Sequence, residues 1–147
     1  MGLTLVSANG AQLTLAVDRY QFGPMDNWYD SNWLVVAGTA QSKNGTWSFR
    51  DPCLLTTEAT SLGHWIIRAA NPSAQMERLE FLEPNLAFER LMIDEGKVVL
   101  RVEFDVEARP RFAGYGDLYV VDLPVSASSC ISAGKSWLAS LEKFPPR

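Results

Sequence analysis

The sequence contains few of the residues that metal sites and disulfide-stabilised folds require. Its 147 residues include two cysteines and one histidine. Cys53 and Cys130 lie far apart and form no CxxC motif, and His64 has no cysteine or second histidine near it in sequence. Both thiols are therefore predicted to be small buried groups of a reducing compartment. We expect the protein to hold no metal and no cofactor.

Long apolar runs and an excess of basic residues are also missing. No stretch approaches the length of a membrane-spanning helix, and the first residues lack the basic-then-apolar pattern of a signal peptide. The net charge of −4 argues against nucleic acid or an anionic membrane as a direct partner, because both normally require a basic patch. We expect a cytoplasmic protein that forms one domain over residues 1–147.

The hydrophobic pattern predicts an α+β fold, built mainly from an antiparallel β-sheet of about eight hairpin-connected strands. Apolar and polar residues alternate most clearly over 98–106 and 13–17. Turn signals at Asn9-Gly10, at Asn44-Gly45 and at residues 94–96 join neighbouring strands, and short turns of this kind connect antiparallel strands. The other strands are expected at residues 3–6, 33–39, 46–49, 76–82, 86–91 and 118–123.

Two helices are predicted, one in mid-chain and one near the C-terminal end. Thr56 or Thr57 is expected to cap the first helix, and Asn71-Pro72 to stop it. Ser126 is expected to cap the second helix, which ends before Pro145-Pro146. The buried face of the first helix is predicted to carry Leu62, Trp65 or Ile66, and Ala69. That of the second is predicted to carry Ile131, Lys135 or Gly134, Leu138 and Leu141.

Motifs of nucleotide binding and nucleophilic catalysis are missing from the sequence. Neither GxxxxGK[ST] nor GxGxxG occurs, and no GxSxG accompanies His64. Residues 133–136, AGKS, match the end of a phosphate loop. They lack its earlier glycine, however, and they fall inside the second predicted helix. We therefore expect no catalytic residues, and a binding protein rather than an enzyme.

Carboxylates on the central strands suggest one alternative. Glu103 and Asp105 lie two residues apart and so share a face of their strand. Glycoside hydrolases use two facing carboxylates, so a small hydrolase-like or carbohydrate-binding domain is the alternative prediction. The favoured interpretation is a solvated sheet face on which Arg101 and Arg90 are cross-strand partners of the acids.

An aromatic stretch at residues 28–33, WYDSNW, offers a second candidate surface. Exposed Trp and Tyr among polar groups are typical of binding hot spots and also of sugar platforms. Alternatively, Trp33 plugs the end of the sheet together with Trp28 or Tyr29, while Asp30 and Asn32 bond to loop amides. The candidate partner-binding residues from both regions are Asp26, Trp28, Tyr29, Asp30, Glu103 and Asp105.

Several short blocks occur in a fixed order over nearly the whole chain. They are YQF at 20–22, YDSNWLVV at 29–36, WSF at 47–49, DPCLLT at 51–56, LEFLEPNLAFE at 79–89, EARP at 107–110 and LEKFPPR at 141–147. Together these blocks resemble the WapI family of bacterial immunity proteins.

The resemblance implies a cytoplasmic protein that binds and neutralises a toxin domain of the WapA type, which acts on tRNA. It supplies no catalytic residues. An acidic chain would suit a basic RNA-cutting partner, because opposite charges speed the encounter. We therefore expect a protein partner, the toxin domain. A hydrolase-like or carbohydrate-binding domain, or a domain without a ligand, remains the alternative.

Overall fold

Seven β-strands, three α-helices and two short 3₁₀ helices form the described part of the computed structural model, residues 2–114 and 116–147. All strand pairs are antiparallel, as predicted. The elements in order are β1 (Leu3–Val6), β2 (Gln12–Tyr20), α1 (Trp28–Asn32), β3 (Trp33–Ser42), β4 (Gly45–Leu55), α2 (Thr56–Arg68), β5 (Leu86–Asp94), β6 (Lys97–Phe104), η1 (Val106–Ala108), β7 (Tyr119–Ser126), α3 (Ala127–Ser140) and η2 (Leu141–Lys143).

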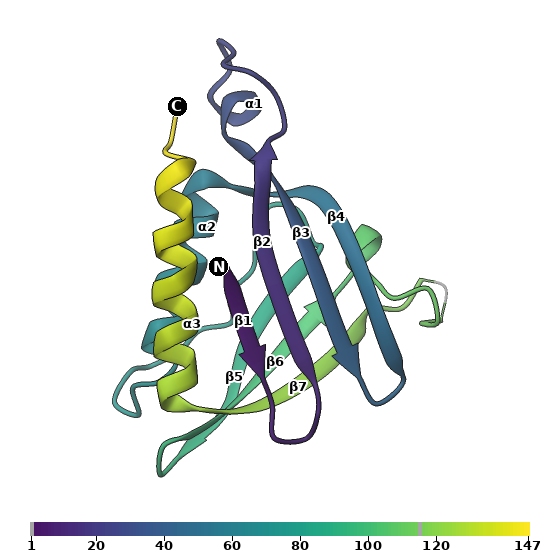
Figure 1. The fold of residues 1–147 in the computed structure, drawn as a ribbon, viewed down its shortest axis with the longest axis vertical. Helices are drawn as coiled ribbons and strands as arrows, with labels where there is room; N and C mark the ends of the chain where they lie inside the picture. The colour runs from purple at the N-terminus through teal and green to yellow at the C-terminus, as the bar shows by residue number, and fades with distance from the viewer. Residues whose placement is uncertain (1, 115) are drawn as a thin grey trace.

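The strands form two sheets rather than one. One sheet has the order β1-β2-β3-β4 and the other the order β5-β6-β7. In Figure 1 the four-stranded sheet lies in front, and the strands of the three-stranded sheet cross behind it in a different direction. Trp47 and Phe49 of β4 pack edge-on against Phe104 of β6, with ring centroids 5.0 and 6.1 Å apart. The main core therefore lies between the two sheets.

The alternating sequence pattern explains which face of each strand is buried. Leu3 and Leu5 of β1 are fully buried, whereas the intervening Thr4 is exposed. β6 alternates in the same way along its whole length. Because successive side chains of a strand point to opposite faces, each sheet turns one apolar face to the shared core.

All three predicted turns form hairpins, which join β1 to β2, β3 to β4 and β5 to β6. The last turn requires positive φ at two successive residues, 45° at Glu95 and 79° at Gly96. Positive φ at both central residues is the geometry of a type I′ turn, whose twist matches that of the flanking strands.

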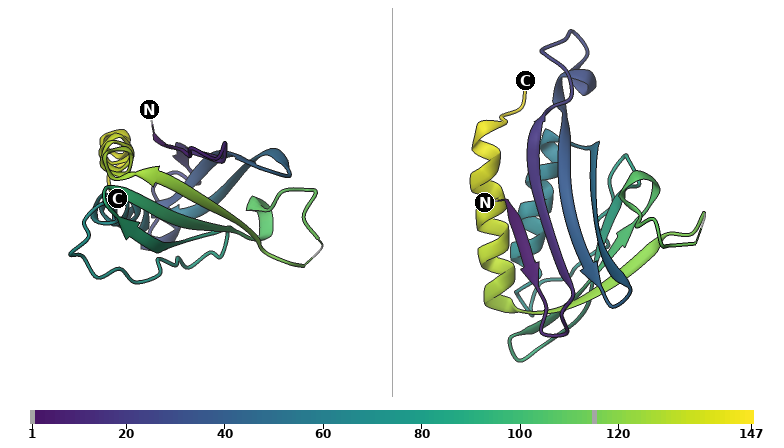
Figure 2. Two further views of the ribbon diagram at one scale, coloured as in Figure 1. Left: turned by 90° about the horizontal axis from the view of Figure 1, so that it is seen from below. Right: turned by 45° about the vertical axis from the view of Figure 1, so that its right-hand side comes forward.

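Helices α2 and α3 lie side by side and close one side of the two-sheet core (Figure 1; Figure 2, right). Their backbones approach closely at two glycines. A Cβ atom on Gly134 would lie 2.8 Å from the Gly63 carbonyl oxygen, and one on Gly63 would lie 2.5 Å from a methyl carbon of Leu138. The indole of Trp137 donates a 2.7 Å hydrogen bond to the carbonyl of Ala59, which fixes the pair.

The predicted buried face of α3 is only partly right. Gly134 and Leu141 are buried and Leu138 is half-buried, but Ile131 and Lys135 are exposed. The small residues of α3 face α2, because they permit the two helix backbones to approach closely. Ile131 therefore lies on the solvent side of α3. The buried positions of α3 itself are Cys130, Ala133, Gly134 and Trp137.

The two long helices, α2 and α3, have different kinds of N-cap. Leu55, not Thr56 or Thr57, is the N-cap of α2, and the Glu58 carboxylate accepts a 3.0 Å hydrogen bond from the Leu55 amide. Ser126 caps α3 as predicted, since its hydroxyl accepts a hydrogen bond from the Ser129 amide. The buried face predicted for α2 is confirmed.

The predicted strand at 76–82 is wrong, and the count of eight strands with it. This segment makes a single bridge to β5, between Leu79 and Phe88. Two residues further along β5, the strand bulges after Arg90, whose guanidinium donates to the carbonyls of Ala69, Asn71 and Ala74. The count of two helices is also wrong, because α1 forms where a loop was expected.

Candidate functional site

Helix α1 is a single turn at one end of the molecule, between β2 and β3 (Figure 1). The Asn27 side chain caps it by accepting hydrogen bonds from the amides of Tyr29, at 2.8 Å, and Asp30, at 3.3 Å. The Ser31 hydroxyl both donates to the Met25 carbonyl and accepts from the Met25 amide, at 2.7 and 2.8 Å. These side-chain caps explain why a short polar segment forms a helical turn here.

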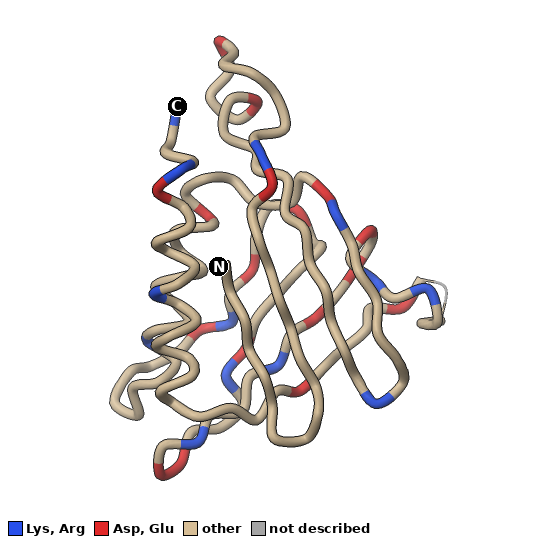
Figure 3. Tube along the Cα trace, viewed as in Figure 1, with Lys and Arg blue, Asp and Glu red and all other residues tan. Residues whose placement is uncertain are grey.

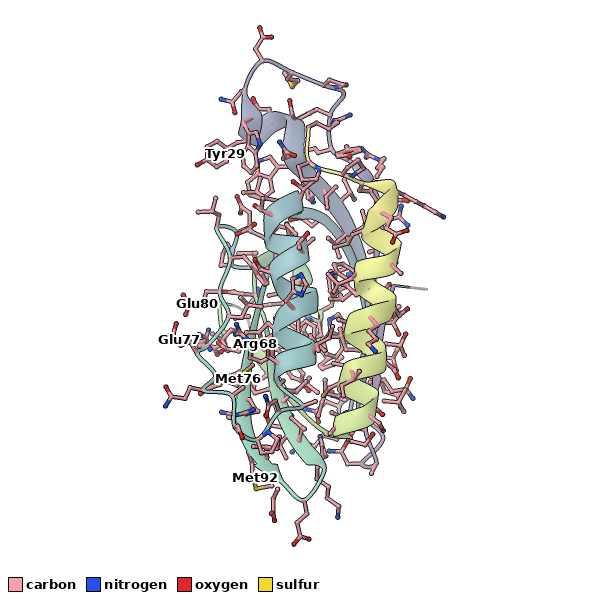
Figure 4. All side chains as sticks on the ribbon, turned by 90° about the vertical axis from the view of Figure 1, so that its left-hand side faces the viewer. Tyr29, Arg68, Met76, Glu77, Glu80 and Met92 are labelled. Atoms are coloured by element: carbon pink, nitrogen blue, oxygen red, sulfur yellow. The ribbon has the colours of Figure 1, made fainter. Side chains whose placement is uncertain are left out.

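Both aromatic side chains that begin α1 face solvent. Trp28 is 43% exposed and Tyr29 is 54% exposed. Their rings pack edge to face, with centroids 5.3 Å apart and planes at 84°. Figure 4 shows Tyr29 projecting outward near one end of the molecule. Only Trp33, which is half-buried, matches the alternative in which these aromatics plug the end of the sheet.

Asn32 anchors α1 to the rest of the fold. It is fully buried, and each polar atom of its amide has two partners. Its Oδ1 accepts from the Thr56 hydroxyl at 2.8 Å and from the Arg147 amide at 2.9 Å. Its Nδ2 donates to the carbonyls of Trp28 and Arg147, both at 2.7 Å. A satisfied buried amide of this kind holds three separate segments in one geometry.

Arg147 adds a second attachment between the C-terminal segment and the α1 region. Its guanidinium donates to the carbonyls of Ser31, at 3.2 Å, and Phe22, at 2.7 Å. The guanidinium carbon also lies 3.7 Å from the centroid of the Tyr20 ring. The Tyr20 hydroxyl in turn donates to the carbonyl of Pro145. These contacts hold both ends of the loop before α1. They therefore fix the backbone that carries the exposed rings, and we refer to this fixed backbone as the rigid base of α1.

The acids beside these rings have no basic partner among residues 2–114 and 116–147. No lysine or arginine of the described residues forms an ion pair with Asp26 or Asp30. Arg147, the cation near the base of α1, is instead occupied by carbonyls and by the Tyr20 ring. We refer to Asp26, Trp28, Tyr29 and Asp30 as the α1 face. It combines uncompensated negative charge with exposed aromatic surface.

Glu103 and Asp105 lie elsewhere and already have partners, and they do not share a strand face as predicted, because β6 ends at Phe104. Arg78 pairs with both Glu103 and Glu80, the latter at 2.6 Å. The Asp105 carboxylate accepts a 2.8 Å hydrogen bond from the Val106 amide and so caps η1. A hollow of about 180 Å³ lies beside these groups. The structure therefore does not join Glu103 and Asp105 to the α1 face, and Arg78 lines the same hollow as the two acids.

The predicted arginine partners are wrong, because among the described residues neither Arg101 nor Arg90 pairs with Glu103 or Asp105. Arg101 of β6 pairs with Asp122 of β7 through two hydrogen bonds of 2.8 and 3.1 Å, which hold the pKa of the guanidinium above its ordinary value. Arg90 instead caps the C-terminal end of α2. The partner that Glu103 does have, Arg78, comes from the irregular segment before β5, which the alternating pattern of the strands does not reveal.

Neither thiol is suited to nucleophilic chemistry. Burial raises the pKa of Cys53 to about 12, with a further contribution from the negative charge of Asp51. Burial raises the pKa of Cys130 to about 11. At neutral pH both side chains are therefore thiols, and the thiolate is the reactive form of cysteine. Both behave as core residues, in agreement with their predicted burial.

The described residues give little indication of a catalytic histidine or of a metal site. His64 lies exposed on α2. Among residues 2–114 and 116–147, no group of three or more His, Cys, Asp or Glu side chains is arranged to hold a metal ion. Within the same residues no helix has both the length and the apolar character needed to cross a membrane.

A comparison with protein-family models adds a finding that covers most of the chain. The model of the immunity protein WapI-like family matches residues 4–145. The chain belongs to this family. A comparison with curated proteins gives no match. The WapI-like family consists of immunity proteins, so membership supports an immunity role for this chain, with a toxin protein as the general kind of partner.

Membership in the WapI-like family also bears on the chemistry of the site. An immunity role suggests that the chain acts by binding rather than by catalysis. The α1 face, with exposed rings and unpaired acids on a fixed base, is a surface suited to such binding.

Proposed function

We propose that the chain neutralises a toxin domain of the WapA type, which targets tRNA, by binding it through the α1 face in the cytoplasm. The observation that carries this proposal is the pair of exposed rings, Trp28 and Tyr29, flanked by two carboxylates that have no basic partner in the part of the chain that the structure describes. Trp and Tyr are enriched among the residues that dominate binding energy at protein interfaces.

The rigid base of α1 supports this role. Ordering a loop on binding costs free energy, and a loop that is already fixed avoids that cost. The Asn32 and Arg147 contacts fix the backbone of α1 in the free protein. Two rings with few rotatable bonds then present a large contact area at little further entropic cost.

A stable interface needs more area than α1 alone provides, since each partner typically contributes about 800 Å². The segment before β5 supplies a neighbouring surface. Glu77 and Glu80 project from the same side of the molecule as Tyr29 (Figure 4). Leu82, 65% exposed, is tied to the start of α2 because its amide donates to the Glu58 carboxylate. We propose that the interface extends from the α1 face along this acidic segment.

The proposal is tested by isothermal titration calorimetry against the toxin domain encoded beside the gene of this chain. We expect one-to-one binding with a dissociation constant below about 100 nM, and loss of toxin-dependent tRNA cleavage at equimolar ratio. The variant Trp28→Ala/Tyr29→Ala should bind at least about 100-fold more weakly. Thr14→Ala, on the outer face of the four-stranded sheet, is the matched control and should bind like the parent.

Absence of heat and of co-elution on size exclusion would contradict the toxin partner. Tight binding that the double variant leaves unchanged would instead contradict the α1 face as the binding surface. Unfolding curves of both variants establish that the comparison is made between folded proteins.

A further inference from the structure

We propose that the α1 face enters the RNA-binding site of the toxin domain and imitates the substrate, with carboxylates in place of phosphates and rings in place of bases. This inference rests on the proposed function and deepens it by naming the partner surface. It predicts inhibition by direct competition with tRNA rather than by action at a distance from the RNA site.

The chemistry of RNA recognition is the first argument. Proteins that bind single-stranded or distorted RNA combine cations that contact phosphates with flat groups on which bases stack. A protein that fills such a site must offer negative charge and flat rings close together. The α1 face does so within the five residues 26–30, where Asp26 and Asp30 flank Trp28 and Tyr29.

The availability of the negative charge is the second argument. Some acids elsewhere in the chain are paired with arginines: Asp18 with Arg50 at 2.7 Å, and Asp122 with Arg101 at 2.8 Å. Asp26 and Asp30 form no ion pair with any of the described residues. Their charge is therefore free to replace phosphate charge against basic side chains of the toxin domain.

The distribution of charge over the fold is the third argument. Within β1–β4 the charged residues are confined to Asp18, Arg19, Arg50 and Asp51, all toward the end of the sheet that carries α1, as Figure 3 shows. The rest of that sheet is neutral and offers little to a basic site. Glu77, which forms no ion pair with any of the described residues, adds negative charge on the side where Tyr29 projects (Figure 4). A strip that is acidic and aromatic at one end matches a groove that tracks an RNA backbone.

The test is displacement of fluorescently labelled tRNA from a nuclease-inactive variant of the toxin domain, followed by fluorescence anisotropy. We expect the chain to displace the tRNA completely, at a concentration that matches its own dissociation constant for the toxin domain. Asp26→Asn/Asp30→Asn should weaken displacement about tenfold at low salt and less at high salt, because unpaired surface charges are screened. Tyr29→Ala should weaken it about 30-fold at either salt concentration.

The matched control is Val120→Ala, which removes an exposed apolar side chain from the outer face of β7. It should displace tRNA within twofold of the parent. A ternary complex in which tRNA remains bound while cleavage is blocked would overturn the inference and leave the proposed function standing. Failure of the chain to bind the toxin domain at all would overturn the proposed function. Displacement that is insensitive to all four α1-face residues would also overturn the inference.

Discussion

Two acidic regions of this molecule differ in how their charge is compensated. On the outer face of the three-stranded sheet, Asp122 and Glu103 are held by Arg101 and Arg78. On the α1 face, Asp26 and Asp30 have no basic partner among the described residues and stand beside two exposed aromatic rings. The first arrangement completes its charge interactions within the fold, and we propose that another molecule binds the second.

This difference shows that acidic residues in a sequence segment do not reveal whether their charges are paired in the fold. Both regions are acidic in the sequence, and Glu103 and Asp105 are candidate residues together with Asp26 and Asp30, although a solvated sheet face is the favoured interpretation of the first pair. Only the arginines that approach from distant segments separate them. Arg78 reaches Glu103 from 25 residues away, and this partner is what removes Glu103 from consideration as a free group.

The largest effect is expected at the base of the α1 face. Asn32→Ala removes four hydrogen bonds and leaves the groups of Thr56, Trp28 and Arg147 without their partner. Because unsatisfied buried groups are costly, the free energy of unfolding should fall by about 3 kcal/mol in urea titrations. Asn71→Ala, at an exposed asparagine, should cost less than about 1 kcal/mol. Equal effects at the two sites would show that the α1 face has no rigid base.

The second effect separates binding from stability. Tyr29→Ala should lower the affinity for the toxin domain by about 2 kcal/mol, while its free energy of unfolding stays within about 0.5 kcal/mol of the parent. The reason is that Tyr29 is exposed and its ring contacts mainly Trp28. Calorimetric titration and urea unfolding of the same sample measure the two quantities. A large loss of stability without loss of affinity would reverse the roles assigned to the two regions.

The third effect concerns the compensated region. A double-mutant cycle with Arg101→Met and Asp122→Asn should give a coupling energy of about 0.5 kcal/mol in stability, as is usual for half-exposed ion pairs. The same cycle measured on toxin affinity should give no coupling. Coupling in affinity would place the outer face of the three-stranded sheet in the interface.

The smallest effect is expected at Asp51, which forms no ion pair with the described residues and is partly buried. Burial raises the pKa of Asp51, a hydrogen bond from Asn85 opposes this shift, and the charge of Glu107 adds to it. Since the folded state favours the protonated form, this group contributes less stability as pH rises through its folded pKa. Asp51→Asn should therefore stabilise the protein by about 0.3 kcal/mol at neutral pH, a small gain because the carboxyl is only partly buried.

At about pH 3, where Asp51 is protonated in both states, the same substitution should leave the free energy of unfolding unchanged. Urea titrations at the two pH values make the comparison, and Asp117→Asn in an exposed loop is the control. A gain that is larger in acid would contradict the sign of the shift.

Local sequence signals predicted much of the fold. Alternation located the strands, because a half-buried strand must present apolar residues at every second position. Asn-Gly and Glu-Gly turns located the hairpins. The segment 76–82 shows the limit of this reasoning: its pattern is that of a strand, but it pairs with β5 only at Leu79, because alternation alone does not supply a partner strand.

The candidate site was harder to predict, because its supports come from distant parts of the chain. The Trp28-Tyr29 pair was visible as an aromatic stretch, but its exposure depends on the α1 cap and on Asn32. Asn32 is bonded to Arg147 across 115 residues, and no periodicity or local motif records such a contact. The buried face of α3 was misplaced for a related reason, since the partner helix decides which side turns inward.

The most direct test of the account is hydrogen–deuterium exchange of the chain alone and in complex with the toxin domain. The comparison is between residues 22–31, which carry the α1 face, and residues 93–97, the exposed β5–β6 hairpin near Met92, which lies at the opposite end of the molecule from Tyr29 in Figure 4. The account predicts slower exchange over 22–31 in the complex and unchanged exchange over 93–97. Slower exchange at 93–97 with none at 22–31 would contradict it.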